Sequence, residues 1–158
     1  MKISFGMIFS IILIVVFLSF AFFAIKTFLG FQKSAESGKF LSDFQADIDR
    51  VWKSAQSSQI ETYTLPGKIE YICFVDFEGP VKGQSKDFYK DLERANYGNE
   101  NFVFYPFGSS DIDSRTIKNV NLSAITSNEN PFCIKNIDGK ITLTLKKEFS
   151  ENLVRIER

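Results

Sequence analysis

The hydrophobic pattern of the chain begins with an uninterrupted apolar run: residues 3–25 are 23 consecutive residues without a charge. A helix rises about 1.5 Å per residue, so this run would be about 35 Å long, enough to cross a hydrocarbon core of about 30 Å. The core helix of a small soluble domain is rarely apolar on every side. We therefore predict a membrane anchor over residues 1–30.

A cleaved secretory signal is the alternative for the same segment. Lys2 supplies a basic start, and Ser19-Phe20-Ala21 has the small-x-small pattern of a cleavage site. The apolar stretch is nevertheless longer than the usual signal core of about 7–15 residues and continues past this site to Ile25. Its length favours an anchor that remains in the mature protein.

Residues 31–57 change to the pattern of an amphipathic helix. Gly30 and Gly38 are weak helix formers that could interrupt the join with the anchor; if neither does, the two segments form one long helix. Charged residues fill the positions between the apolar ones. The apolar residues recur at steps of three and four, which places them on one helical face: Phe40, Phe44, Ile48, Val51, Trp52 and Ala55.

Short runs of apolar and β-branched residues predict a sheet region over residues 58–158. The expected strands are 60–65, 68–77, 101–107, 132–135, 140–146 and 153–157, with a weaker candidate at 116–125. Residues 84–96 have the spacing of a short surface helix. The pair Asp138-Gly139 suits a tight turn and predicts a hairpin between strands 132–135 and 140–146.

Strand 68–77 is predicted to lie centrally in its sheet. Tyr71, Cys73 and Val75 share one face, and Ile72 and Phe74 make the other face apolar too. The expected fold class is therefore α+β: an N-terminal transmembrane helix continues into an amphipathic helix that packs on a small, mainly antiparallel β-sheet. The helix over residues 31–57 and the sheet region over residues 58–158 form one domain, residues 31–158.

Cys73 and Cys133 are the only cysteines, and both lie in expected strands. An even number favours a disulfide, which requires an oxidising compartment. The bond would close a loop of about 60 residues and contribute about 4 kcal/mol by the chain-entropy model. Two unrelated buried thiols are the alternative, because free cysteine packs like a small hydrophobe. We predict the disulfide.

A disulfide would place the domain outside the cytoplasm. Asn121 begins an Asn-Leu-Ser acceptor pattern, a possible glycosylation site that agrees with this orientation. Lys26, Lys33 and Lys39 are the observation against it, because basic residues usually flank the cytoplasmic end of a span. We expect the extracytoplasmic orientation.

Charge and composition exclude several classes of function. Of the 19 basic residues, Lys2 and Lys26 precede residue 31, which leaves 17 against all 19 acidic residues, so the basic patch of a nucleic-acid binder is missing. The chain has no histidine, the commonest general base and metal ligand, and therefore no Ser-His or Cys-His pair. We expect no catalytic residue, no cofactor and no metal site.

Three sets of acidic residues are candidate sites for a cation or for acid–base chemistry, and one pair of small residues in the anchor is a candidate contact between helices. Asp43, Asp47 and Asp49 are interpreted as part of a solvated helix face, and Asp76 with Glu78 as the end of a strand. Asp111 and Asp113 lack the ligand spacing of a calcium loop. The small-xxx-small pair would let two anchors approach closely and self-associate. This pair is Gly6 and Ser10.

The layout of residues 3–57 resembles that of type IV pilin-like proteins, in which an apolar helix continues into an amphipathic part followed by a sheet domain. The resemblance implies that the apolar half anchors the subunit and later packs a filament core. Two details differ: Gly6 follows Phe5 rather than a basic residue, and no glutamate lies near the start of the run. The first residues are also similar to those of small archaeal single-pass membrane proteins, which imply no particular activity.

These observations predict a single-pass, non-enzymatic structural or interaction protein at the cell surface. Its expected partners are the lipid bilayer and other proteins, and no nucleic acid. A pilin-like filament subunit is the alternative, and a membrane-tethered enzyme of unknown reaction is the third hypothesis.

Overall fold

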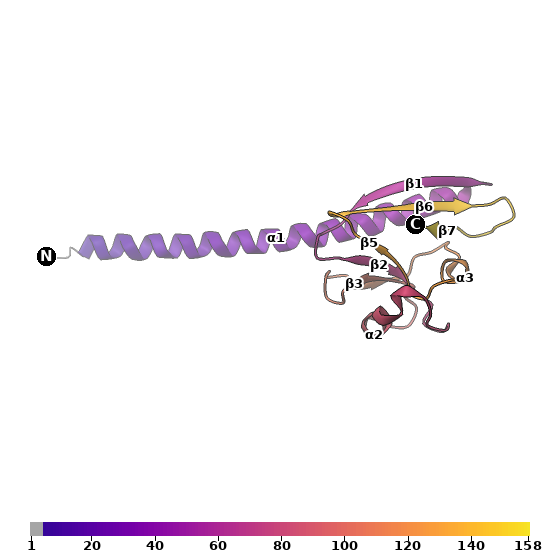
Figure 1. Cartoon of the computed structure of the whole chain (residues 1–158). Coiled ribbons are helices and arrows are strands. Elements are labelled where there is room, and N and C mark those ends of the chain that lie inside the picture. Colours follow the sequence, from indigo (N-terminus) through magenta and orange to yellow (C-terminus); the bar gives the residue numbers. More distant parts are fainter. Residues whose placement is uncertain (1–4) are drawn as a thin grey trace. The chain divides into compact units, whose positions relative to one another are not determined.

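The computed structural model describes residues 5–158, apart from the side chains of residues 31–34. The chain divides into two compact units, Met1–Lys33 and Ser34–Arg158. Figure 1 labels the elements of both units.

The first unit contains the N-terminal part of helix α1 (Phe5–Lys53), which continues through both Gly30 and Gly38. Its apolar side chains are exposed, and α1 is long and apolar enough to cross a membrane. The hydroxyl of Ser10 donates to the carbonyl of Gly6 at 2.9 Å, and that of Ser19 to the carbonyl of Val15 at 2.8 Å. These polar groups are thus satisfied within the helix, as an apolar surrounding requires.

In the second unit, the C-terminal part of α1 buries an apolar face and ends at Lys53, four residues before the expected end. The buried residues are Phe40, Leu41, Phe44, Ile48 and Val51. Trp52 remains 38% exposed, and its indole Nε1 donates to the carbonyl of Asn152 at 3.0 Å.

The first sheet has three antiparallel strands in the order β1-β6-β7, namely β1 (Ser57–Thr64), β6 (Lys140–Lys147) and β7 (Arg155–Glu157). The residues of β6 alternate between the core and solvent, which gives the strand one dry and one wet face. Strands β1 and β6 pair over eight consecutive residues without a bulge.

The second sheet has four antiparallel strands in the order β4-β3-β2-β5. They are β2 (Tyr71–Phe74), β3 (Phe102–Tyr105), β4 (Ser114–Arg115) and β5 (Phe132–Lys135). The predicted central position of β2 is confirmed, although the strand is shorter than expected. Ile72 and Phe74 belong to the main core, whereas Cys73 belongs to a second cluster on the other face.

The predicted hairpin between residues 132–135 and 140–146 is wrong, because β5 and β6 belong to different sheets. The tight turn does form: Asp138 and Gly139 have φ of 52° and 77°, and Ile137 and Lys140 exchange backbone hydrogen bonds. Asn136 explains the separation. Its backbone N–H donates to the carbonyl of Glu70, and its side chain donates to the carbonyls of Pro66 and Ile69. The turn therefore leads the chain from one sheet to the other.

The strand expected at residues 116–125 is also wrong. Residues Leu122–Ile125 form the short helix α3, because the side chain of Asn121 accepts a hydrogen bond from the backbone N–H of Ala124 and caps it. The helix expected at 84–96 consists of three short segments, η1 (Gln84–Phe88), α2 (Tyr89–Leu92) and η2 (Glu93–Ala95).

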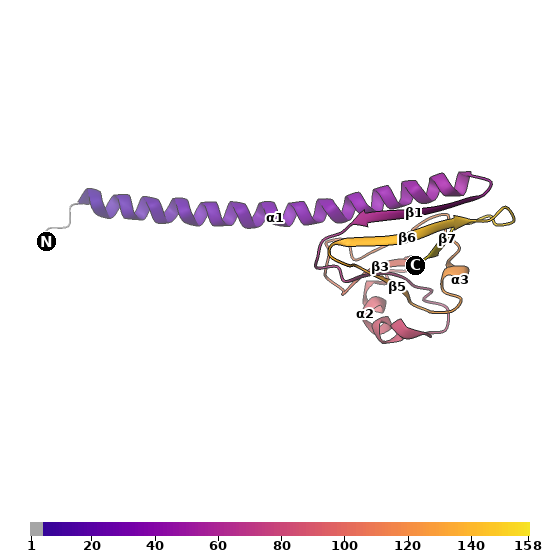
Figure 2. The same ribbon diagram turned by 45° about the horizontal axis from the view of Figure 1, so that its top comes forward.

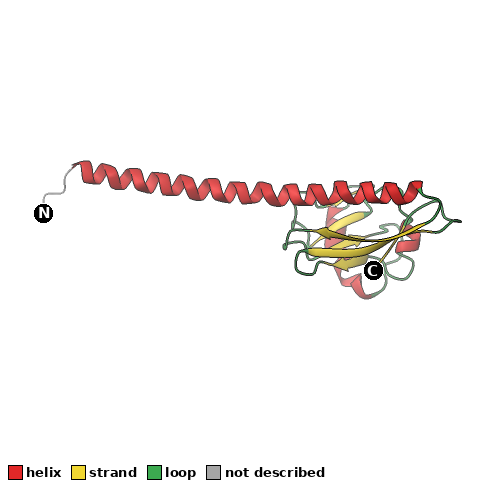
Figure 3. Cartoon of the chain, turned by 90° about the horizontal axis from the view of Figure 1, so that it is seen from above, coloured by secondary structure: helices red, strands yellow, loops and turns green. Residues whose placement is uncertain are grey.

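Aromatic rings from α1 and from both sheets meet in the main core of the second unit. The ring of Phe44 lies 5.5 Å from that of Tyr63 on β1 and 6.1 Å from those of Phe74 and Phe102 on the second sheet. The ring centroid of Phe40 lies 5.3 Å from that of Tyr63 and 5.4 Å from that of Phe44. Figures 2 and 3 show the C-terminal part of α1 running alongside the strands of the second unit.

Replacing Phe44 tests this core. We expect Phe44→Ala to lower the free energy of unfolding by about 3–5 kcal/mol, because it opens a cavity among fully buried rings. Phe149→Ala is the matched control, since Phe149 is 81% exposed and its loss should change the value by less than about 0.5 kcal/mol. Denaturant unfolding of the full chain in detergent micelles, followed by the fluorescence of Trp52, measures both. Equal values for the two variants would contradict the arrangement.

Candidate functional site

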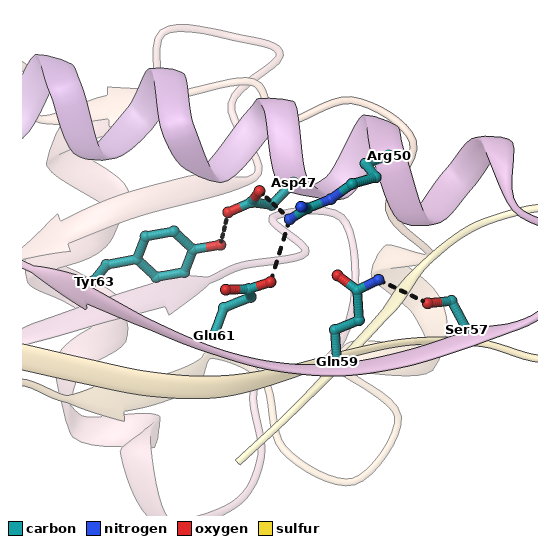
Figure 4. A network of polar contacts seen from close by, with 6 residues as sticks. All are labelled: Asp47, Arg50, Ser57, Gln59, Glu61 and Tyr63. Carbon is teal, nitrogen blue, oxygen red and sulfur yellow. Dashed lines mark hydrogen bonds and ion pairs between the residues drawn. The ribbon is translucent and has the colours of Figure 1, made fainter.

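A polar network joins α1 to β1 at the edge of the main core (Figure 4). Asp47 and Arg50 lie three residues apart on α1 and so project from one side of the helix. Glu61 and Tyr63 lie two residues apart on β1 and so share one face of the strand. Helix and strand thereby bring four polar side chains together.

The phenol of Tyr63 donates to Asp47 Oδ2 at 2.8 Å. Arg50 Nη2 contacts the other oxygen of Asp47 and lies 3.2 Å from Glu61 Oε1. Next along the strand, Gln59 donates to the hydroxyl of Ser57 at 3.2 Å. Two carboxylates and one guanidinium leave the network with an excess of negative charge.

Burial raises the pKa of Tyr63 far above its usual value, and the hydrogen bond to Asp47 and the negative charges of Asp47 and Glu61 raise it further. The charge of Arg50 acts in the opposite direction but does not outweigh these effects. Tyr63 therefore stays protonated at neutral pH and acts as a hydrogen-bond donor. The network holds helix and strand in register rather than presenting an activated nucleophile or base.

The acidic candidates identified in the sequence are dispersed rather than brought together. Asp43 pairs with Lys39 on the helix surface. Asp49 accepts hydrogen bonds from Gln45 at 2.9 Å and from Asn119 at 2.8 Å. Within residues 5–158, no three Asp, Glu or Cys side chains lie close enough to hold a metal ion.

The remaining carboxylates hold turns. Asp76 accepts hydrogen bonds from the backbone N–H groups of Glu78 and Gly79, both at 3.1 Å. Asp113 accepts one from the N–H of Gly108 at 2.9 Å, in the loop that also contains Asp111. These contacts pair backbone donors of the turns with carboxylate acceptors.

Cys73 and Cys133 lie directly opposite each other on β2 and β5. Their Cα atoms are 4.1 Å apart, and their sulfur atoms form a disulfide at 2.10 Å. Both side chains are buried in the second cluster, between the second sheet and the helical segments over residues 84–95. Leu92 and Ala95 from these segments cover them.

The other two candidates lie on helices. Asn121 is half-buried, and its side-chain oxygen caps α3, as described above. Gly6 and Ser10 lie on one side of α1, one turn apart, and the hydroxyl of Ser10 donates to the carbonyl of Gly6. Their roles in glycosylation and in self-association stay predictions.

The sequence did not indicate a polar cluster around Glu129. Its carboxylate accepts hydrogen bonds from the hydroxyl of Ser85 at 2.6 Å and from Arg158 at 2.7 Å. Burial acts to raise the pKa of Glu129, yet these bonds outweigh it and hold the pKa below its usual value. Arg158 also lies over the ring of Phe132 at 4.6 Å. No sequence signal connects groups so far apart in the chain.

Comparisons with protein-family models, with curated proteins and with solved structures found no match for this chain.

The pH dependence of stability tests the environment of Tyr63. The folded chain keeps the phenol protonated at a pH where the unfolded chain, with a tyrosine pKa of about 10, loses the proton. The free energy of unfolding should therefore fall as the pH rises above about 10, and Tyr63→Phe should make this fall less steep. Tyr97→Phe, at a 73% exposed position, serves as the control. Denaturant unfolding between pH 8 and 11 measures the slopes; identical slopes for Tyr63→Phe and the parent would refute the prediction.

Proposed function

We propose that this protein is a single-pass membrane protein whose domain lies outside the cytoplasm and serves a structural or interaction role. The single observation that carries the proposal is the combination, in one chain, of an uncharged helix of membrane-spanning length and a disulfide-bonded domain. The helix supports attachment to a bilayer, and the disulfide supports an oxidising compartment.

The amphipathic part of α1 supports a direct connection between anchor and domain. Its buried rings contact both sheets, and the Asp47–Arg50–Glu61–Tyr63 network adds polar contacts to β1. In this proposal the C-terminal part of α1 is itself an element of the core of the domain.

The use of the carboxylates supports a role without catalysis. Asp47, Asp76, Asp113 and Glu129 each accept hydrogen bonds from neighbouring groups of the fold. General acids and bases instead need a pKa near the working pH and access to a substrate. We propose binding or assembly as the activity of the domain.

Cysteine labelling in intact cells tests compartment and disulfide separately. We expect a membrane-impermeant maleimide to label Tyr97→Cys without lysis, because position 97 is exposed. The native cysteines should react only after denaturation together with reduction, since they are buried and joined.

Two results would contradict this proposal. Labelling of Tyr97→Cys only after lysis would place the domain in the cytoplasm. Labelling of Cys73 and Cys133 in denaturant without reductant would show free thiols in the cell.

A pilin-like filament subunit is the second candidate, favoured by one observation. Helix α1 is a single helix whose N-terminal part is exposed and apolar and whose C-terminal part contributes to the core of an antiparallel sheet domain. A filament would cover the exposed part by packing such helices together.

Mass spectrometry of the mature chain distinguishes the two candidates. Removal of the residues before or near Gly6, together with filaments in electron micrographs, is expected for the pilin-like subunit. A mature chain that retains Met1 would exclude processing of this kind and leave the membrane-anchored domain.

A further inference from the structure

Strand β1 is an open sheet edge of unusual length for this fold. The two sheets have four edge strands, and three of them are short: β7 has three residues, β4 two and β5 four. Strand β1 has eight residues and pairs only with β6. Short edge strands offer few unpaired backbone groups, whereas a strand of eight residues offers a full row of them.

The backbone groups that face this open edge can be identified from the register. The N–H of Leu65 donates to the carbonyl of Gly139, which continues the β1–β6 pairing by one residue. In an antiparallel ladder, the backbone N–H and C=O groups of every second residue point toward a given partner strand. Because Leu65 is bonded to Gly139, which directly precedes β6, the backbone groups of the odd-numbered residues of β1 point toward β6. The backbone groups of the even-numbered residues therefore face away from β6, where the described residues place no other strand. These residues are Ser58, Ile60, Thr62 and Thr64.

The sequence and the pairing of strand β1 itself lack the features that commonly protect an edge. The strand contains no proline, lysine or arginine, and its pairing has no bulge. Its one charged residue, Glu61, points to the face that carries Arg50. On the opposite face, Ile60 is 75% exposed. A long, regular edge without these features is a surface on which a further strand can pair.

We infer that β1 pairs antiparallel with β1 of a second copy of this chain, with residue 60 of one copy opposite residue 60 of the other. Centring the pair on Ile60 places the two isoleucines in contact and sets Gln59 opposite Glu61 of the second copy, an amide donor facing a carboxylate acceptor. Centring it on Glu61 would set two like charges opposite each other, which is destabilising.

The Ile60 register also matches the direction of the backbone groups. Residues 58, 60 and 62 face the open edge and would meet residues 62, 60 and 58 of the second copy, which gives about six backbone hydrogen bonds. Two such strands bury less surface than a standard interface, so we expect a weak, concentration-dependent dimer. The inference concerns the second unit alone, and its test is separate from that of the proposed function.

Cysteine cross-linking of the full chain in detergent micelles tests the register. The native cysteines are joined, so an added cysteine is the only free thiol. Opposed residues in a hydrogen-bonded pair have Cα atoms about 5.5 Å apart, within reach of a disulfide. We expect Ile60→Cys to form a covalent dimer under mild oxidation.

Three matched variants define the register. Each of Ser58→Cys and Thr62→Cys alone should form no disulfide-linked dimer, but the two should cross-link when mixed, because position 58 faces position 62 of the second copy. Ile137→Cys, exposed but outside the strand, should form no dimer. Dimers of Thr62→Cys alone, or equal dimers of Ile60→Cys and Ile137→Cys, would overturn the inference.

A proline at the edge provides an independent test. Because the N–H of Thr62 faces away from β6, Thr62→Pro removes an edge donor and leaves the β1–β6 ladder intact. In the Ile60→Cys background it should abolish the cross-link while the unfolding transition keeps its cooperativity. A cross-link that survives Thr62→Pro, or a chain that in whole cells cross-links only to a different protein, would also overturn the inference.

Discussion

The contact of Phe44 with rings from both sheets is the interaction on which the second unit depends. A sheet of three strands and a sheet of four, most of them only two to four residues long, cannot cover a core by themselves. The C-terminal part of α1 supplies the missing apolar surface, and its rings reach Tyr63 on one sheet and Phe74 and Phe102 on the other. The register between α1 and β1 is then fixed by the bond from Tyr63 to Asp47.

Local patterns predicted the elements better than their partners. Strand β5 has the predicted bounds, and the central place of β2 follows from apolar residues on both of its faces. The turn at Asp138 and Gly139 was also recognisable, because its chemistry is local. That this turn does not close a hairpin was not recognisable. Hydrogen bonds from Asn136 to residues about 70 positions earlier hold β5 apart from β6. Such long-range contacts leave no periodic signal in the sequence.

The candidate sites show the same limit. The sequence favoured pairing of the two cysteines but contained nothing that would set them directly opposite each other on neighbouring strands. It grouped Asp43, Asp47 and Asp49 because they are close in the chain, whereas the fold gives each a different partner. The Asp47–Tyr63 bond and the cluster around Glu129 require tertiary packing, and a single sequence does not specify it.

The disulfide divides the domain in a way that matters for mechanical load. The covalent loop between Cys73 and Cys133 encloses β3, β4 and all the short helical segments, while α1, β1, β6 and β7 lie outside it. A pull that reaches the domain through its N-terminal helix therefore acts on the β1–β6 ladder and passes across the sulfur–sulfur bond. The residues between the cysteines cannot be extended by the pull. The stretched domain is therefore shorter by about 200 Å, at about 3.3–3.6 Å per extended residue. A stretched domain would lose its first sheet, while the residues between the cysteines stay within a closed covalent ring.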